Sequence, residues 1–303
     1  MAEFPYDIRY YRPTDFNDFV LLYRAAEALE PIGRPGSPQA IAEKLGRPNY
    51  NTEADLVVVA RDADLVGFLD MVPERAIGRV IVDCWLRPEH RRQGLAPRLL
   101  DNAMRRAREL GATVIHVNIR KDNETAKNVL TGLGFHYVRC FLELSLDMSA
   151  VDPDEADRAA RELSFLRPGE EEKLAQIQNR SFADHWGYNP NTPETVTYRI
   201  NLSHRSPRDV VLAYEGDKLN GYCWTEVIKK GQGRIYMIGT DPDYRGQGLG
   251  RKLLLAGLSR LKSKGVKIVW LTVDSANETA CALYNSVGFR RHTSYLWYEK
   301  AVV

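Results

Sequence analysis

A glycine-rich segment lies between an apolar stretch and a segment with helical periodicity. It consists of Arg245, Gly246, Gln247, Gly248, Leu249 and Gly250. Free backbone N–H groups and the positive end of the following helix would form a cradle for an anion there. Glycine also lets a pyrophosphate group approach the backbone closely. One such turn is equally compatible with an ordinary tight loop. However, the pattern recurs as Arg-Arg-Gln-Gly-Leu-Ala at residues 91–96.

An internal repeat explains the recurrence. Residues 67–135 align with residues 221–289 at a constant shift of 154, without a gap. The shared residues include glycines, prolines, a Gln-Gly-Leu triplet and an Asn-Glu-Thr-Ala quartet. A period of half the chain indicates two copies of one domain rather than a solenoid. We predict an N-terminal domain at 1–147, a linker at 148–162 and a C-terminal domain at 163–303.

Each copy shows the same alternation of elements. In the second copy, residues 210–214, 219–228 and 234–240 are predicted strands, and leucines on one face predict a helix over 251–264. A β-branched strand at 267–273 and a helix at 278–287, with Asn277 as its N-cap, follow. The expected fold class is mixed α/β, with two tandem domains that each contain a central mixed sheet flanked by helices.

The two motifs together resemble the GNAT superfamily of acetyl-CoA-dependent N-acetyltransferases. The first is Arg-x-x-Gly-x-Gly/Ala after a strand, and the second is Asn-x-x-Ala-x-x-x-Tyr-x-x-x-Gly-Phe. The resemblance covers nearly the whole chain. It implies that acetyl-CoA is the co-substrate and that no metal takes part. The cofactor-binding residues that it implies in the second copy are Ile238, Gly239, Thr240, Arg245, Gly246, Gln247, Gly248, Leu249, Gly250, Arg251 and Asn277.

Tyr284 is the residue at which the two copies differ most in chemistry. The resemblance places it near the thioester sulfur, where a phenol with an ordinary pKa near 10 could protonate the leaving thiolate. The first copy has Leu130 at the corresponding position, and leucine has no proton to give. We therefore predict an active C-terminal copy and a degenerate N-terminal copy. Whether the first copy binds coenzyme A stays open.

Acceptor recognition is expected from the region before the cofactor motif. Residues 179–194 are rich in aromatic and titratable groups, and Asp184 and His185 could deprotonate an ammonium group or hold a polar substrate. Glu226, on a preceding strand, is another candidate base. Tyr222 and Trp224 alternate with Glu226 and share its sheet face, where packing is their expected role.

Within the superfamily, the tandem arrangement is similar to the mycothiol synthase family. The sequence departs from that family at Arg234, where a carboxylate is expected before the aromatic part of the strand. The change of charge predicts a different amine acceptor, such as one with an anionic group. A small amine, an antibiotic or the α-amine of a peptide or protein fits equally well.

Composition excludes several other classes of protein. The 303 residues carry a formal net charge of +2 and no long basic run, so nucleic acid is not an expected partner. The four cysteines show no CxxC pairing, and thus no metal site is indicated. No apolar stretch approaches the length of a membrane span, and residues 1–10 do not resemble a secretory signal. The expected location is the cytoplasm.

Two readings remain for the whole chain. The first is an N-acetyltransferase that transfers the acetyl group directly to an amine, and Tyr284 with the intact glycine-rich loop favours it. The second is a non-catalytic module that binds coenzyme A or acyl-CoA, or a scaffold. The sequence leaves the oligomeric state open.

Overall fold

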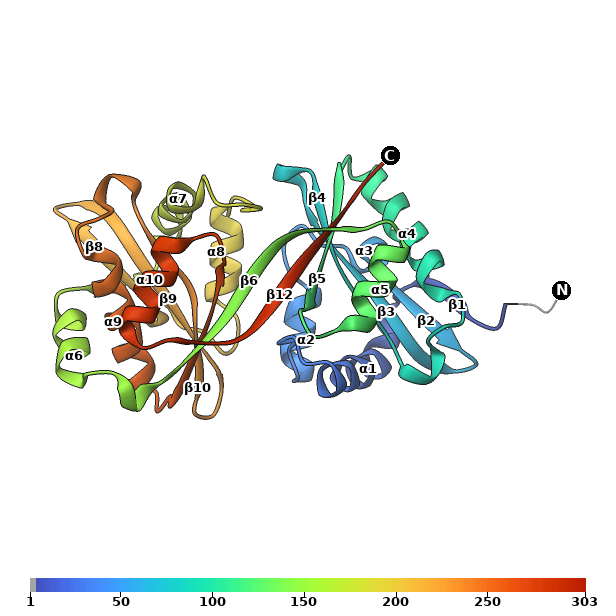
Figure 1. Cartoon of the computed structure of the whole chain (residues 1–303), viewed down its shortest axis with the longest axis horizontal. Coiled ribbons are helices and arrows are strands. Elements are labelled where there is room, and N and C mark those ends of the chain that lie inside the picture. Colours follow the sequence, from blue (N-terminus) through green and yellow to red (C-terminus); the bar gives the residue numbers. More distant parts are fainter. Residues whose placement is uncertain (1–3) are drawn as a thin grey trace. The chain divides into compact units, whose positions relative to one another are not determined.

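The computed structural model describes residues 4–303, and the chain divides into two compact units (Figure 1). Unit 1 contains the chain up to Arg139 together with Leu296–Val303, and unit 2 is Cys140–Tyr295. Both combine strands and helices, as expected from the alternation of elements. The mixed α/β fold class is therefore confirmed.

Unit 1 has a sheet with helices on both faces. Its strands follow the order β1, β2, β3, β4, β5 and then the end of β12, and β4 and β5 pair in parallel. The elements are β1 (Asp7–Tyr10), α1 (Phe16–Leu29), α2 (Pro38–Leu45), α3 (Thr52–Asp55), β2 (Leu56–Arg61), β3 (Asp64–Glu74), β4 (Arg79–Leu86), α4 (Leu95–Glu109), β5 (Val114–Arg120) and α5 (Glu124–Gly132).

Unit 2 repeats this plan. Its strand order is β7, β8, β9, β10, β11 and β6, with β10 and β11 parallel. The elements are β6 (His136–Asp147), α6 (Pro153–Arg161), β7 (Ser164–Phe165), α7 (Glu171–Phe182), α8 (Pro193–Ile200), β8 (Val210–Glu215), β9 (Lys218–Lys229), β10 (Gln232–Thr240), α9 (Leu249–Ser263), β11 (Ile268–Asp274), α10 (Glu278–Val287) and β12 (Arg290–Ala301).

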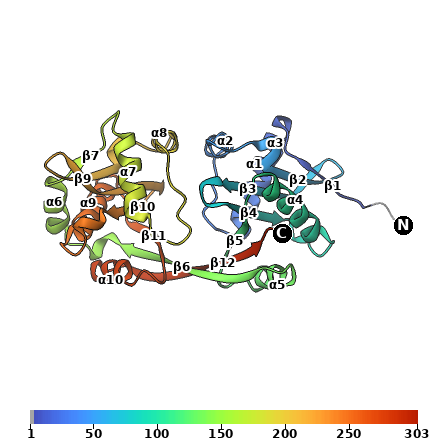
Figure 2. The same cartoon turned by 90° about the horizontal axis from the view of Figure 1, so that it is seen from above.

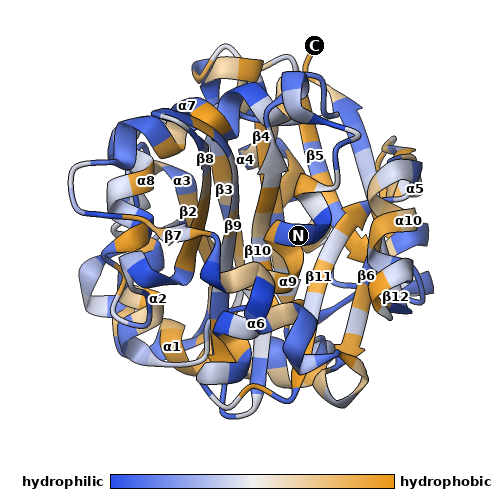
Figure 3. Ribbon diagram, turned by 90° about the vertical axis from the view of Figure 1, so that its left-hand side faces the viewer, coloured by the Kyte–Doolittle hydropathy of each residue, from blue (hydrophilic) through white to orange (hydrophobic). Residues whose placement is uncertain are grey.

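Two apolar layers hold the sheet of unit 2. Residues of α9 and α10 pack on one face, and residues of α7 and α8 pack on the other. Figure 2 shows α8 and α10 on opposite sides of β10, and Figure 3 shows hydrophobic stretches along β8 to β10 between helices with polar segments. The leucines of the predicted helix are buried in α9, because their spacing places them on one face.

Each unit is completed by a strand from the other half of the sequence. Residues 140–147 of β6 pair with β11 in unit 2, although they end the first repeat. Conversely, the last part of β12 ends the second repeat but belongs to unit 1 (Figure 1). Its Tyr298 is buried in the core of that unit. The compact units thus differ from the expected division at 147 and 163.

The segment predicted as a linker is an ordered part of unit 2. Residues 153–161 form α6, which begins after the N-cap Asp152 and has Pro153 in its first turn. Ala156 and Ala159 are buried in the core against α9. The sequence did not indicate this helix, because two alanines in an otherwise polar segment give a weak apolar pattern.

β10 separates from β11 after only three residues. The pairing covers Gln232–Arg234, and residues 235–240 have no partner on β11. On the β9 side, the register shifts between Ile235 and Met237, so that Tyr236 is the extra residue of a β-bulge. As a result, Tyr236 and Met237 both face α7 and α8, whereas Ile235 and Ile238 face α9 and α10.

The corresponding strand of unit 1 has no bulge. β3 and β4 pair in a continuous register from Gly67 with Leu86 to Glu74 with Arg79. Val82, which corresponds to Tyr236, packs in the core beside α4 and α5. The two copies therefore differ in backbone geometry as well as in side chains.

The strand exchange makes a prediction about stability. Tyr298→Ala should lower the free energy of unfolding of unit 1 by about 3 kcal/mol, because it removes a buried aromatic ring and leaves a cavity. Hydrogen exchange should accelerate in β2 to β5. Phe289→Ala, as the matched change in unit 2, should instead accelerate exchange in β8 to β11. Faster exchange confined to unit 2 in Tyr298→Ala would contradict the assignment of this strand to unit 1.

Candidate active site in unit 2

A cavity of about 390 Å³ lies where β10, the glycine-rich loop and α10 meet. Its walls come from the end of α7, the open edge of β10, the first turn of α9 and one face of α10. The lining residues are Ser181, Phe182, His185, Ile238, Gly239, Thr240, Tyr244, Arg245, Gly246, Gly248, Leu249, Gly250, Arg251, Asn277, Thr279, Ala280, Leu283 and Tyr284.

The glycine-rich loop has the backbone that an anion cradle requires. Gly246 and Gly248 have φ values of 76° and 79°, in the left-handed region that disfavours other residues. Gly248 is the N-cap of α9, and no side chain caps the free N–H groups there. No atom lies within 4 Å of a Cβ built at either glycine. The backbone thus faces open space at a helix N-terminus, where an anion is favoured.

The two arginines of this motif are engaged by the protein. Arg245 donates from Nη2 to the backbone carbonyl of Ser181 at 2.8 Å. Arg251 donates to Glu155 of α6 at 3.0 and 3.1 Å and to Ser286 Oγ at 3.2 Å. Both line the cavity, and these contacts fix their positions at its wall. Gln247, also predicted to bind the cofactor, is exposed and does not line the cavity.

The open edge of β10 forms the opposite wall. Ile238, Gly239 and Thr240 all line the cavity, in the part of β10 that does not pair with β11. A Cβ at Gly239 would lie 2.8 Å from Ser181 Cβ and 2.9 Å from Tyr222 Cε1. Glycine is therefore required at this position for close packing against α7 and β9.

Tyr284 lies on the face of α10 that borders the cavity. Its side chain is buried, and the Phe289 ring packs edge-on with a centroid distance of 5.9 Å. Burial raises the pKa of Tyr284 well above its ordinary value, so the phenol stays protonated at neutral pH. Asn277 caps α10 by accepting a hydrogen bond from Ala280 N at 3.1 Å, and it also lines the cavity.

Of the other predicted catalytic residues, only His185 reaches the cavity. Its ring packs edge-on against Phe182 at 4.5 Å. Burial, and then the positive charge of Arg245, lower the pKa of His185 below the ordinary 6.5. The imidazole is therefore neutral at pH 7 and can accept a proton. Asp184 is exposed and does not line the cavity.

Glu226 also lies away from the cavity lining. Its carboxylate pairs with His204 Nε2 at 2.9 Å and with Arg205 Nη2 at 3.1 Å. Tyr222 and Trp224 are buried on the same sheet face, as predicted for packing residues. Arg234 approaches Glu143 at 3.6 Å.

Several lining residues were not singled out from the sequence. Thr279, Ala280 and Leu283 share the helix face of Tyr284, so a helical projection around this tyrosine would have found them. Ser181 comes from α7, which approaches the cavity only through tertiary packing. No sequence spacing indicates that approach.

Unit 1 differs at the corresponding positions. Arg92, with φ 59°, replaces Gly246, and Leu130 is buried where unit 2 has Tyr284. Gly94 keeps its left-handed conformation at the N-cap of α4. Thus unit 1 retains the helix start but neither the second loop glycine nor a proton donor.

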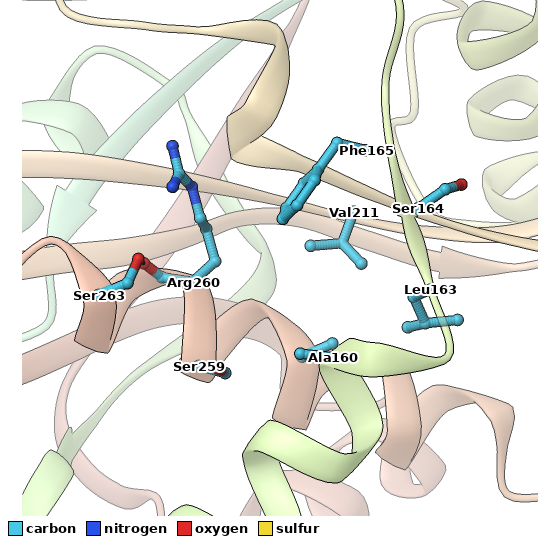
Figure 4. Close-up of a pocket in the computed structure, with 9 residues that line it drawn as sticks. Ala160, Leu163, Ser164, Phe165, Val211, Ser259, Arg260 and Ser263 are labelled. Atoms are coloured by element: carbon cyan, nitrogen blue, oxygen red, sulfur yellow. The ribbon is translucent and has the colours of Figure 1, made fainter.

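A smaller cavity of about 180 Å³ lies elsewhere in unit 2 (Figure 4). Leu163, Phe165 and Val211 contribute apolar walls, and Arg260 borders it from α9. The Arg260 guanidinium pairs with Asp209 at 3.2 Å. None of the predicted site residues lies there.

Comparisons with known proteins agree with the fold and the motifs. A model of the Acetyltransferase (GNAT) family matches the chain twice, over residues 22–135 and 172–289. The chain belongs to the GNAT family of acetyltransferases. As the sequence indicated, it is an acetyl-CoA-dependent N-acetyltransferase, and the alternative of a non-catalytic module is not favoured.

Individual relatives and solved structures are similar to this chain over nearly its whole length. It is 30% identical to a mycothiol acetyltransferase from Thermobispora bispora, over 95% of this chain and 98% of that protein. A GCN5-related N-acetyltransferase from Sphaerobacter thermophilus has a similar structure, with a TM-score of 0.75 and 20% identity, covering 100% and 97% of the two chains. A tandem GNAT protein from the clavulanic acid biosynthesis pathway has a TM-score of 0.72 and 17% identity, covering 98% and 99%. The predicted resemblance to tandem, mycothiol synthase-like enzymes is confirmed.

Among the described residues, no helix combines the length and apolar character needed to cross a membrane.

Gly248 at the start of α9 and Gly94 at the start of α4 allow a matched test of anion binding by the glycine-rich loop. Gly248→Ala should weaken coenzyme A binding and acetylation by at least about tenfold, since the added Cβ occupies space that an anion would approach. Gly94→Ala should cost similar stability, about 1 kcal/mol for a left-handed alanine, yet leave turnover within twofold. Calorimetric titration of coenzyme A and steady-state rates measure both effects. Equal losses of activity in two folded variants would show that unit 1 contributes to the working site.

Proposed function

We propose that unit 2 carries the acetyltransferase reaction and that its cavity receives the thioester end of acetyl-CoA together with a small-molecule amine. The single observation that carries this proposal is the convergence on one cavity of the open β10 edge, the uncapped start of α9 and the Tyr284 phenol. In unit 1, β4 also leaves its parallel partner after Val82, but Leu130 replaces the phenol.

The residues of unit 2 can bind each part of acetyl-CoA and can assist the direct transfer of the acetyl group to the amine. Backbone N–H groups at the start of α9 would hold the pyrophosphate, and the unpaired edge of β10 would bind the extended pantetheine arm as an added strand does. The acceptor nitrogen forms a bond to the thioester carbonyl carbon, and the C–S bond then breaks. Tyr284 gives its proton to the departing thiolate, and the amine loses a proton to a base.

Tyr284 is suited to this step by its protonation state. A general acid must still carry its proton at the working pH, and it then stabilises the departing thiolate by a hydrogen bond that develops into proton transfer as the C–S bond breaks. Burial keeps the Tyr284 phenol protonated. Among the described residues, no hydrogen bond holds its hydroxyl elsewhere, which leaves it available to the sulfur.

His185 is the base that the geometry favours. It is the one predicted base that lines the cavity, and its lowered pKa keeps the imidazole neutral at pH 7. Glu226 is engaged by two cationic or potentially cationic side chains, and Asp184 faces solvent. We therefore assign proton removal from the acceptor to His185.

A small-molecule amine is the acceptor class that the relatives support, since several are named mycothiol acetyltransferase. Arg234 occupies the position where the sequence led us to expect a carboxylate. The expectation of an acceptor other than that of mycothiol synthases remains a prediction.

Tyr284→Phe tests the proposed acid. Because phenylalanine keeps the ring packing but lacks the proton, kcat should fall by roughly 10² or more while the Kd for coenzyme A changes only a few-fold. Leu130→Phe in unit 1 is the matched control and should leave kcat unchanged. A Tyr284→Phe enzyme with the original kcat would limit this residue to packing.

His185→Gln tests the proposed base through the pH profile. Protonation of His185 removes the acceptor for the proton, so kcat/KM should fall as the pH drops through the lowered pKa of His185. The variant should lose this acidic limb and be about 10²-fold slower at pH 7. His292→Gln, an exposed histidine of the same unit, should retain the profile. Persistence of the same acidic limb in His185→Gln would assign it to another group.

A further inference from the structure

Arg205 carries a buried charge that the protein only partly neutralises. Its side chain is 7% exposed, and Nη2 is 3.1 Å from Glu226 Oε2. Its Nε and Nη1 atoms are buried without a hydrogen-bond partner. Buried N–H groups of a guanidinium normally have partners, because leaving them unpaired is costly. Nε and Nη1 of Arg205 therefore remain as hydrogen-bond donors without partners, in a position that is largely closed to solvent.

Aromatic rings fix the orientation of this guanidinium. Arg205 Cζ lies 4.4 Å from the centroid of the Tyr236 ring and 5.4 Å from that of Trp224. The bulge in β10 brings Tyr236 to this face, and its ring packs edge-on against Trp224. Stacking holds the guanidinium plane while its N–H groups stay available at the edge.

A second arginine lies beside it on the sheet. Arg234 is directly opposite Glu226 in the β9–β10 register, so the two side chains share a face. Arg234 Nε is also buried without a partner, and its one ion pair, to Glu143, is loose at 3.6 Å. Glu226 thus pairs with Arg205 and lies opposite Arg234 in the register, and both arginines retain unpaired donors.

On the corresponding face of the sheet in unit 1, a buried carboxylate of the protein neutralises the nearby cationic side chains. Asp70 corresponds to Trp224 by the shift of 154 and is almost fully buried. Lys44 pairs with it, Arg47 donates to it at 3.0 Å, and the Tyr50 hydroxyl donates at 2.7 Å. In unit 2 an indole occupies the position of this carboxylate. The arginines there pair with Glu226 and Glu143 instead, and these pairs leave Nε of both arginines and Nη1 of Arg205 without a partner.

We propose that the acceptor of this enzyme is an amine that also carries an oxyanion, and that Arg205 binds this oxyanion with Arg234 beside it. The inference rests on the proposed function of unit 2. A carboxylate and a phosphate both match the fork of a guanidinium. Tyr236 precedes the cavity residue Ile238 by two positions, about 7 Å along a strand. The bulge turns Tyr236 to the α7 and α8 face, and Ser181 and Phe182 of α7 also line the cavity, so a small molecule could reach from the cavity to this face.

Matched pairs of acceptors test the proposal. One set of acceptors, the carboxylate arm, compares α-amino acids with their amides. A second set, the phosphate arm, compares ethanolamine phosphate with ethanolamine and glucosamine 6-phosphate with glucosamine. The wild-type enzyme should prefer the anionic member in at least one arm. Arg205→Gln should reduce that preference by about 10- to 100-fold, as the loss of a charge-assisted hydrogen bond predicts. The arm that responds identifies the oxyanion.

Controls separate recognition from folding and from cofactor binding. Arg208→Gln is the matched change at an exposed arginine three residues away and should keep the wild-type preference. Arg205→Lys retains the charge without the fork and should lose part of the preference. The Kd for coenzyme A should be unchanged in all three variants. The preferred anionic amine, added with coenzyme A, should raise the melting temperature of the wild type but not of Arg205→Gln.

The outcomes are distinguishable. Equal use of charged and neutral amines by the wild type, or an unchanged preference in Arg205→Gln, would overturn the proposed role of Arg205 while leaving the acetyltransferase activity of unit 2 intact. A wild-type protein that binds acetyl-CoA but acetylates no amine in either arm would contradict the proposed function, and the inference with it.

Discussion

The separation of β10 from β11 is the constraint on which the site depends. Parallel pairing stops after Arg234, and the rest of β10 presents an edge whose backbone groups need a partner. The bulge at Tyr236 changes the faces of the side chains just where the pairing ends. Consequently one short segment serves two purposes. Its edge lines the cavity at Ile238–Thr240, and its bulge places Tyr236 against Arg205 on the other face.

The two units show how one fold can keep its architecture while its chemistry changes. Both have a left-handed glycine at the start of the helix that follows the splayed strand, since the chain must turn sharply there. In unit 1 the strand has no bulge, a leucine replaces the tyrosine, and Asp70 neutralises nearby cations. Unit 1 thus lacks the bulge and the proton donor, whereas unit 2 combines an open strand edge with Tyr284 and with unpaired guanidinium donors.

The sequence was informative where the relevant contacts are local. The shift of 154, the glycines at 246 and 248 and the Asn277 cap each depend on a few neighbouring residues, and the structure has them as expected. The exchange of the last strands could not be read from the sequence, because either partner buries the same apolar side chains. Nor could the bulge at Tyr236, which depends on pairing with β9 across the hairpin. Arg205 lies in a polar segment without periodicity, and its burial results from packing on two aromatic rings.

The central claim is that the cofactor works in unit 2, at the start of α9 and the open edge of β10. Hydrogen–deuterium exchange with and without coenzyme A tests it most directly, because the proposed contacts are made by backbone N–H groups. We predict that coenzyme A protects residues 238–240 and 245–251, with smaller changes in residues 91–97 of unit 1. Protection of residues 91–97 without protection of the unit 2 segments would contradict this account.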